Sequence, residues 1–132
     1  MFKLLYDITG SPRAIGNAMN VPVTSGEGYV MGEALVIKNG AATKCGATEK
    51  PTQMCCRDQA AGAKENILVY PITGTMHFGV KVTAAASSLK VGDKVTIAAD
   101  GLGVTATTTS GVCEIVNTNG AVSAGDEIVV KF

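Results

Sequence analysis

The sequence predicts an all-β fold, a single antiparallel β-barrel or sandwich of short strands. The first observation is a phrase that occurs three times, a glycine followed by an acid and then alternating apolar residues, at Gly32-Glu33, Gly92-Asp93 and Gly125-Asp126. Glycine tolerates the positive φ of a tight turn, the acid can accept hydrogen bonds from turn amides, and the period-two pattern is typical of a half-buried strand. The second observation is that strand-like segments recur between Gly and Asn turns, without helical periodicity.

The N-terminal residues 1–25 are predicted to form an extended arm ahead of a body at 26–132. Gly10, Pro12, Gly16 and Pro22 recur too closely for a helix or a long regular strand. The front of the arm is too apolar for a solvated tail, so we expect it to lie against the body or against a neighbouring subunit. The candidate contact residues are Phe2, Leu4, Leu5, Tyr6 and Ile8. A body without residues 1–9 is expected to fold but to lose its binding partner.

The first half of the body is expected to contain a hairpin followed by less regular strands. Tyr29 to Lys38 and Ala41 to Cys45 flank Asn39-Gly40, which suits a type I′ hairpin turn. Residues 46–66 are compatible with a loop, a short strand through Gln53 to Arg57, or a single helical turn. Residues 67–82 are rich in β-branched and aromatic residues but broken at Pro71 and Gly74, which favours two strands or one bent strand.

The second half of the body is expected to contain four further strands, over residues 91–98, 104–109, 111–116 and the last residues to Phe132. A turn at residues 100–103 separates the first two, and Asn119-Gly120 supplies another tight turn before the last.

Charge and length exclude several classes of function. The chain has 132 residues, with 11 basic and 11 acidic side chains and a formal net charge of zero. It is long enough for one core, and it lacks the basic field that gathers phosphates, so nucleic acid is not expected as a partner. Lys3 and Asp7 interrupt the apolar start well short of a signal peptide, and no stretch approaches membrane-spanning length. We therefore expect synthesis in the host cytoplasm and no membrane partner.

The residues capable of chemistry do not form a recognisable active site. His77 is the only histidine, and alternation places it on the opposite strand face from Met76 and Phe78, so we expect it to be exposed or at a sheet edge. Cys55 or Cys56 could in principle act as a nucleophile beside it, but no nucleophile motif surrounds them. The sequence therefore predicts no enzyme and no cofactor.

The four cysteines give no metal-binding pattern. Cys45, Cys55, Cys56 and Cys113 form neither Cys-x-x-Cys nor histidine pairs. Free and mostly buried thiols are the simplest interpretation. Disulfides stay open, although Cys55 and Cys56 would point to opposite faces of a strand and would need different partners. The acids lie beside turns or on strands, and no loop gathers enough of them for calcium.

Aromatic residues are scarce, with no tryptophan, three tyrosines and three phenylalanines. Few aromatic side chains are therefore available to stack on sugars or bases, which disfavours a lectin or a protein that binds single-stranded nucleic acid. A host module that binds carbohydrate or another ligand nevertheless stays as an alternative function.

A resemblance to a known family gives the functional prediction. The Gly- and Pro-punctuated arm, the segment Glu27-Gly28-Tyr29-Val30-Met31-Gly32-Glu33-Ala34-Leu35, and the short Ala- and Thr-rich strands resemble tailed-bacteriophage capsid decoration proteins, also called cement or head auxiliary proteins. The resemblance implies a homotrimer on the outer capsid surface of the virion, with the major capsid protein as partner and no catalytic residues. It also implies that Phe2 to Ile8 engage the shell or a sister subunit. Another virion structural module, such as a head-fibre base or tail component, is the alternative.

Overall fold

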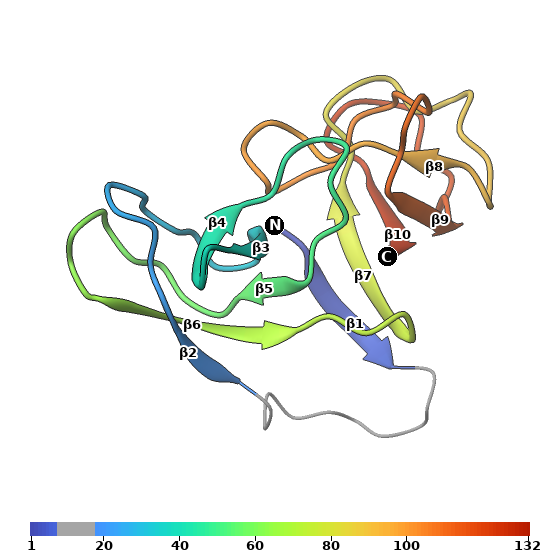
Figure 1. Cartoon of the computed structure of the whole chain (residues 1–132). Coiled ribbons are helices and arrows are strands. Elements are labelled where there is room, and N and C mark those ends of the chain that lie inside the picture. The colour runs from blue at the N-terminus through green and yellow to red at the C-terminus, as the bar shows by residue number, and fades with distance from the viewer. Residues whose placement is uncertain (8–17) are drawn as a thin grey trace.

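The computed structural model describes residues 1–7 and 18–132, and this part of the chain contains ten β-strands and no helix (Figure 1). The strands are β1 (Lys3–Asp7), β2 (Met19–Pro22), β3 (Ala34–Lys38), β4 (Ala41–Lys44), β5 (Gln53–Cys55), β6 (Asn66–Pro71), β7 (Met76–Lys81), β8 (Lys94–Val95), β9 (Cys113–Asn117) and β10 (Glu127–Lys131). They form two five-stranded sheets in which all neighbouring strands are antiparallel. The first sheet has the order β1-β7-β10-β9-β8, and the second has the order β2-β6-β5-β3-β4.

The all-β prediction is confirmed, and of its two forms the structure adopts the sandwich-like one. The two sheets do not close into a barrel in the part of the chain described. β6 and β7, separated by the turn after Pro71, belong to different sheets. The predicted break between residues 67 and 82 therefore marks the point where the chain crosses from one sheet to the other.

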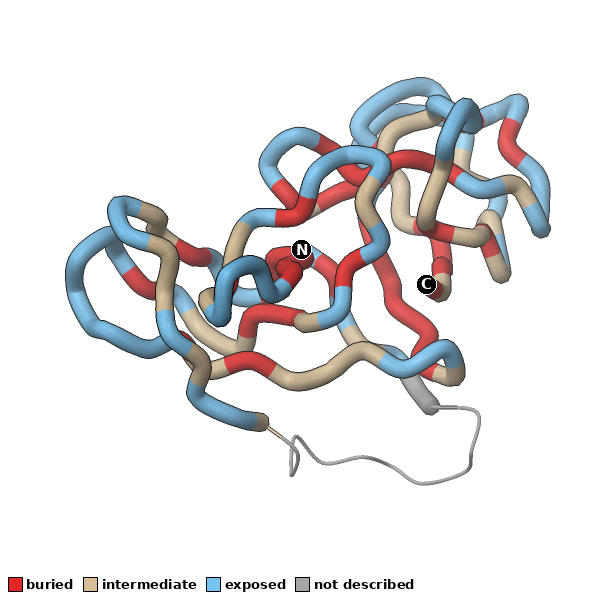
Figure 2. Tube along the Cα trace, in the orientation of Figure 1, coloured by how far each residue is buried: buried red, intermediate tan, exposed pale blue. Residues whose placement is uncertain are grey.

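The main core lies between the two sheets. Phe78, Val80 and Ile128 of the first sheet belong to the same buried cluster as residues of β3 and β5 from the second. Three phenylalanine rings pack within it in tilted and edge-on arrangements, and the ring centroid of Phe132 lies 5.3 Å from that of Phe2 and 5.5 Å from that of Phe78. Buried positions run along nearly the whole of β7 (Figure 2).

A second, smaller core lies on the other face of the second sheet. Its members are Tyr29, Leu35, Ala42, Cys55, Ile67 and Val69. The sheet curls around them, and its edge strands β2 and β4 approach each other through a bridge between Val23 and Ala42. The Tyr29 hydroxyl donates a hydrogen bond to the Ala42 carbonyl (2.8 Å) and accepts one from the Thr24 N–H (2.9 Å). These bonds close the curl across its open side.

The three Gly-acid phrases form three turns of the same build. In each, the acid's backbone N–H donates to the carbonyl three residues earlier, and its carboxylate accepts the backbone N–H of that earlier residue. The pairs are Val30 with Glu33, Lys90 with Asp93, and Ser123 with Asp126. The glycines before these acids have φ values of 76°, 91° and 93°, as the third position of a type II turn requires. The prediction that these phrases are turns placed directly before strands is confirmed.

The predicted hairpin turn is also confirmed, whereas the first strand begins at Ala34 instead of Tyr29, because Val30 to Glu33 form the first Gly-acid turn. Asn39 and Gly40 have φ values of 50° and 78°, the two positive values of a type I′ turn, and Lys38 pairs with Ala41 across it. Asn119 and Gly120 have similar values, 50° and 73°. Of the alternatives for residues 46–66, the structure contains the short strand, as β5.

The prediction of regular strands over residues 91–98 and 104–109 is wrong in extent. Only Lys94 and Val95 form a strand, and Val104 makes isolated bridges to Val82 and Ile97. Beyond Val104 the Thr105 hydroxyl accepts the Thr107 N–H and shares a 2.7 Å hydrogen bond with the Thr96 hydroxyl. Threonine side chains that bond to nearby backbone compete with a regular ladder, which explains why this threonine-rich segment is irregular.

The prediction for His77 is wrong. The residue is 8% exposed, and its strand β7 lies between β1 and β10 instead of at a sheet edge. The period-two pattern does not reveal that the second face of β7 is also covered, which is why Met76, His77 and Phe78 are all buried.

Candidate interaction surface

The structure places the predicted contact residues in unlike surroundings. The Phe2 side chain lies in the main core, and Leu4 is half-buried against it. Leu5 is 45% exposed at a register shift between β1 and β7. The backbone of Tyr6 pairs with His77, and Ile8 lies outside the described residues. Of Phe2, Leu4 and Leu5, whose side chains the structure describes, Leu5 therefore has the apolar side chain best placed to meet another protein, and the contact itself stays a prediction.

The described parts of the predicted arm lie against the body. β1 is an edge strand of the first sheet, and β2 is an edge strand of the second. Contact with the body is one of the two placements expected from the sequence. The division between an arm at 1–25 and a body at 26–132 stays a prediction.

A second set of exposed apolar side chains lies close to the chain's first residue. Met1, Val30 and Met31, here called the methionine patch, are each between 41% and 46% exposed. The Phe2 N–H donates to the Gly32 carbonyl (2.9 Å), and a Cβ on Gly32 would collide with the Met1 side chain. The first residues and the first Gly-acid turn therefore form one continuous surface. Sequence reasoning missed this patch, because nothing local pairs residue 1 with residue 31.

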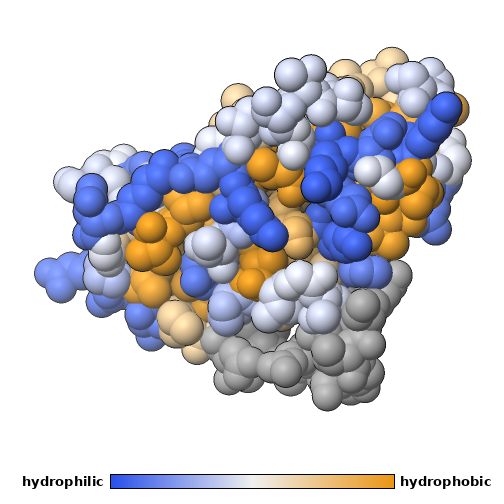
Figure 3. Space-filling view, turned by 45° about the vertical axis from the view of Figure 1, so that its right-hand side comes forward, coloured by the Kyte–Doolittle hydropathy of each residue, from blue (hydrophilic) through white to orange (hydrophobic). Residues whose placement is uncertain are grey.

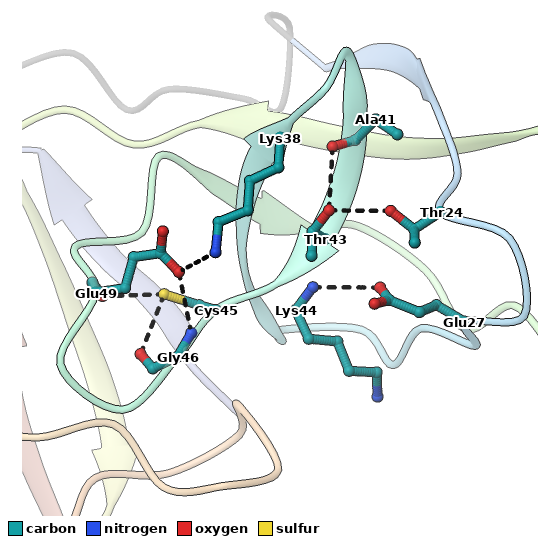
Figure 4. Close-up of polar contacts among 9 residues, drawn as sticks. All are labelled: Thr24, Glu27, Lys38, Ala41, Thr43, Lys44, Cys45, Gly46 and Glu49. Atoms are coloured by element: carbon teal, nitrogen blue, oxygen red, sulfur yellow. Dashed lines mark hydrogen bonds and ion pairs between the residues drawn. The ribbon is translucent and has the colours of Figure 1, made fainter.

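The edge strand β4 is covered by polar contacts instead of being open to another strand (Figure 4). The Thr24 and Thr43 hydroxyls lie 2.9 Å apart, and Glu27 accepts the Lys44 backbone N–H at 3.2 Å. On the other side of β4, Glu49 accepts the Gly46 N–H at 3.4 Å. It also pairs with Lys38 at 2.9 Å, which lowers the pKa of the Glu49 carboxyl.

The edges of the first sheet are also poorly suited to strand addition. β8 has only two residues, and β1 carries both the register shift and Lys3, whose ammonium group lies 3.2 Å from the Glu127 carboxylate. Short edges, bulges and charges are devices that discourage pairing between sheets. Contact with other proteins through side chains is therefore better supported than contact through a sheet edge.

One ion pair joins the first Gly-acid turn to β4. The Glu33 side chain is fully buried, and its carboxylate lies 3.1 Å from the Lys44 ammonium group, which stays half-exposed. Its other oxygen accepts the Val30 N–H. A buried carboxylate needs such partners because its desolvation is costly, so this pair fixes the turn on which Val30 and Met31 are carried.

The four cysteines are free thiols. Burial raises the pKa of Cys45 to about 12 and that of Cys55 to about 11, and it also raises the pKa values of Cys56 and Cys113. A nucleophilic cysteine requires a lowered pKa, so these thiols are protonated and poorly reactive at neutral pH.

Within residues 1–7 and 18–132, no group of three or more His, Cys, Asp or Glu side chains is arranged to hold a metal ion. The same residues include no helix long and apolar enough to cross a membrane. On the face drawn in Figure 3, apolar side chains form several separate patches between hydrophilic ones. The exposed apolar surface of this face is therefore divided and does not form one broad field.

Comparison with known proteins gives a likeness in fold. No protein-family model matches the chain, and no curated protein matches its sequence. Among solved structures, the fold is similar to that of the head fiber gp8.5 N base in bacteriophage phi29, with a TM-score of 0.58 and 15% sequence identity. The similarity covers 87% of this chain and 93% of that one. At this identity the likeness concerns the fold, and it includes both sheets because so little of either chain lies outside it.

Proposed function

We propose that this chain is a non-enzymatic structural protein of a bacteriophage virion, carried on the outer surface of the head. The observation that carries the proposal is the fold similarity to the phi29 head fibre base over most of both chains. The buried, protonated thiols fit a role without nucleophilic chemistry. A rigid β-sandwich can supply contact area across joints of a shell, and an interface of about 1,600 Å² is sufficient for tight binding when its apolar residues pack well.

Two forms of this role are compatible with the fold. In the first, the protein is a decoration protein that adds contacts between capsid subunits. In the second, it is the base of a head fibre and holds a further structure away from the shell. The fold similarity is to a fibre base and so favours the second form, whereas the sequence resemblance favours the first.

The partners in either form are the major capsid protein and further copies of this chain in a homotrimer. Leu5 and the methionine patch are the side chains that we assign to these contacts, because they are apolar and exposed. Strand β1 carries Leu5, and the hydrogen-bonded first Gly-acid turn carries Val30 and Met31. Methionine adapts its shape to a partner surface, which suits such a contact.

A cryo-electron map of the intact virion tests the proposal. Density for the sandwich on the outside of the head is the expected result. Distal density attached to it would identify a fibre base, and isolated sandwiches over the shell would identify a decoration protein. Virions in which the protein is absent from the head would contradict both forms.

A matched pair of variants tests the contact residues on purified heads. We expect Leu5→Asp with Met31→Asp to abolish binding to heads that lack the protein, while Val91→Asp with Val122→Asp leaves binding unchanged, because these valines are also exposed but lie in other turns. Equal binding of both variants in a co-sedimentation assay would remove Leu5 and Met31 from the interface.

The alternative function is a host module that binds carbohydrate or another ligand. Saturable binding in a glycan or metabolite screen with the isolated protein, together with failure to bind heads, would favour it over the virion role.

A further inference from the structure

A cleft of about 430 Å³ lies beside the last residues of β10. The letter C in Figure 1 marks this end of the chain. Three strands of the first sheet, three connecting segments and the residue after β10 supply its walls. The residues that line it are Lys50, Gly74, Lys94, Gly111, Val112, Glu114, Lys131 and Phe132. Neither the predicted contact residues nor the methionine patch is among them, so the cleft is a separate feature.

Positive charge exceeds negative charge in this cleft. Lys131 forms an ion pair with Glu114, with 3.1 Å between the ammonium nitrogen and the carboxylate oxygen. Lys94 lies opposite Glu114 in the β8–β9 ladder, and Lys50 comes from the loop between β4 and β5. Among the described residues, no acidic oxygen lies within ion-pair distance of Lys50 or Lys94. Three lysines and one glutamate thus line the cleft, an excess of positive charge that persists when a carboxylate at Phe132 is counted.

The apolar part of the cleft lining, here called its apolar floor, is formed by two residues that belong to the main core or pack on it. Phe132 belongs to the phenylalanine cluster of the main core, and Val112 packs against the same core. The Val112 N–H donates to the Val95 carbonyl (3.0 Å). A Cβ on Gly111 would collide with the Lys94 carbonyl, so glycine there allows the start of β9 to lie directly against β8. The lysines therefore stand around a preformed site.

We propose that this cleft binds an acidic segment of a partner protein. One or more Asp or Glu side chains of the segment reach Lys50 and Lys94, and an apolar side chain beside them contacts Val112 and Phe132. An extended peptide suits the site better than a small anion, because the cleft combines separated cations with an apolar floor. Nucleic acid is a poorer match, because the chain as a whole has no net positive charge to attract it.

The inference goes beyond the virion role and is tested on the isolated protein. The probe is the peptide acetyl-Asp-Glu-Leu-Asp-Glu-amide, titrated by calorimetry at low ionic strength. We expect saturable binding that weakens as salt is added, because exposed charges are screened. The same peptide with Asn and Gln in place of Asp and Glu is expected not to bind. Absence of saturable binding by the acidic peptide would overturn the proposal.

Paired lysine variants locate the binding. Lys50→Gln with Lys94→Gln is expected to weaken peptide binding at least tenfold. Lys64→Gln with Lys90→Gln removes the same charge from exposed positions outside the cleft and is expected to change it less than twofold. Equal loss in both pairs would show a non-specific charge effect and would overturn the site.

A variant that keeps the charge provides an independent test. A Cβ on Gly74 would meet only the Phe132 carbonyl, at an ordinary contact distance of 3.8 Å, and the φ of Gly74 is not in the left-handed region. We expect Gly74→Leu to fold, as checked by circular dichroism, and to weaken peptide binding at least tenfold by filling the cleft. Unchanged binding would contradict the site, and inorganic phosphate that competes as well as the peptide would contradict the acidic segment as its ligand.

Discussion

The two cores of this protein are built on opposite faces of the same strand. In β3, Ala34 and Val36 face the main core between the sheets, while Leu35 faces the second core within the curled sheet. The main core is large and closed by aromatic rings, whereas the second has six buried members and is closed by the hydrogen bonds of one tyrosine. Apolar area therefore dominates the stability of the first, and a few directional bonds matter more in the second.

The largest effect on stability is expected when the first residues are removed, because they belong to the main core. Deleting residues 1–9 takes away β1 and the Phe2 ring, which contacts Phe78 and Phe132 in the main core. We expect loss of cooperative thermal unfolding, contrary to the expectation from sequence that the body folds without these residues. Lys3→Ala is the control. It breaks only an exposed ion pair and is expected to leave the free energy of unfolding within about 0.5 kcal/mol. A truncated protein with a sharp transition would show that the main core does not need its N-terminal strand.

Substitutions of large core side chains by alanine measure how much each core contributes to the free energy of unfolding. Phe78→Ala in the main core is expected to lower the free energy of unfolding by about 3–5 kcal/mol, and Leu35→Ala in the second by about 2–3 kcal/mol, since a smaller core collapses more easily around the lost volume. Urea titrations followed by far-UV circular dichroism measure both. A larger loss of unfolding free energy in Leu35→Ala than in Phe78→Ala would contradict this order.

Removing one hydroxyl tests how the second core is closed. Tyr29→Phe leaves the Ala42 carbonyl and the Thr24 N–H without this partner and is expected to lower the free energy of unfolding by about 1–3 kcal/mol. Tyr70→Phe is the matched control, because within the described residues the Tyr70 hydroxyl makes no hydrogen bond, and we expect a change below about 0.5 kcal/mol. Similar losses in the two variants would count against the role of Tyr29 as the closing residue.

The three Gly-acid turns give a further comparison of the two cores. Gly32 precedes β3, which both cores share, whereas Gly92 and Gly125 precede β8 and β10 of the first sheet. Alanine at Gly92 or Gly125 meets open space and is expected to lower the free energy of unfolding by about 1–2 kcal/mol through its left-handed φ alone. Gly32→Ala is expected to lower it more, because the Phe2 carbonyl lies 2.9 Å from the new Cβ. Three equal values in thermal melts would disprove this added steric contribution.

The smallest expected effect concerns the rates at which the four thiols are alkylated, which report on both cores without disturbing them. Each raised pKa keeps its thiol protonated at pH 7, and the reactive thiolate fraction grows as pH rises toward that pKa. Alkylation at pH 7 is therefore expected to be slow. Half-buried Cys56 should react first, then Cys55 of the second core, and finally Cys45 and Cys113 of the main core. Mass spectrometry over a pH series gives the order, and rapid labelling of Cys45 at pH 7 would contradict it.

Local features of this fold could be predicted from sequence, and features that depend on distant strands could not. The Gly-acid turns and the Asn39-Gly40 hairpin use contacts within four residues, so their residue types are sufficient to predict them. The second core was missed because Ala34 to Ile37 are all apolar, and an unbroken apolar run hides which faces are covered. His77 was misplaced for a related reason, since nothing near it in the sequence shows that β1 pairs beside β7 or that the second face of β7 is covered.

The same limit applies to the surfaces that we assign to partners. The sequence shows that the start of the chain is apolar, but it does not show that the Phe2 side chain is buried while that of Leu5 is exposed. The lysines of the cleft are separated by up to 81 positions along the chain, the interval from Lys50 to Lys131. The strand order of the first sheet brings Lys94 of β8 near Lys131 of β10, and the β4–β5 loop, which packs against the segment after β8, adds Lys50.

The strand order also determines how the molecule would respond to mechanical force. β1 and β10 both run antiparallel to β7, which lies between them, so they run parallel to each other. If the start of β1 and the end of β10 were pulled apart along the strand direction, their ladders with β7 would be strained in shear, with several hydrogen bonds loaded at once. Strands peeled from one end would instead lose their bonds one at a time. The first sheet is thus arranged to resist stretching along its own length.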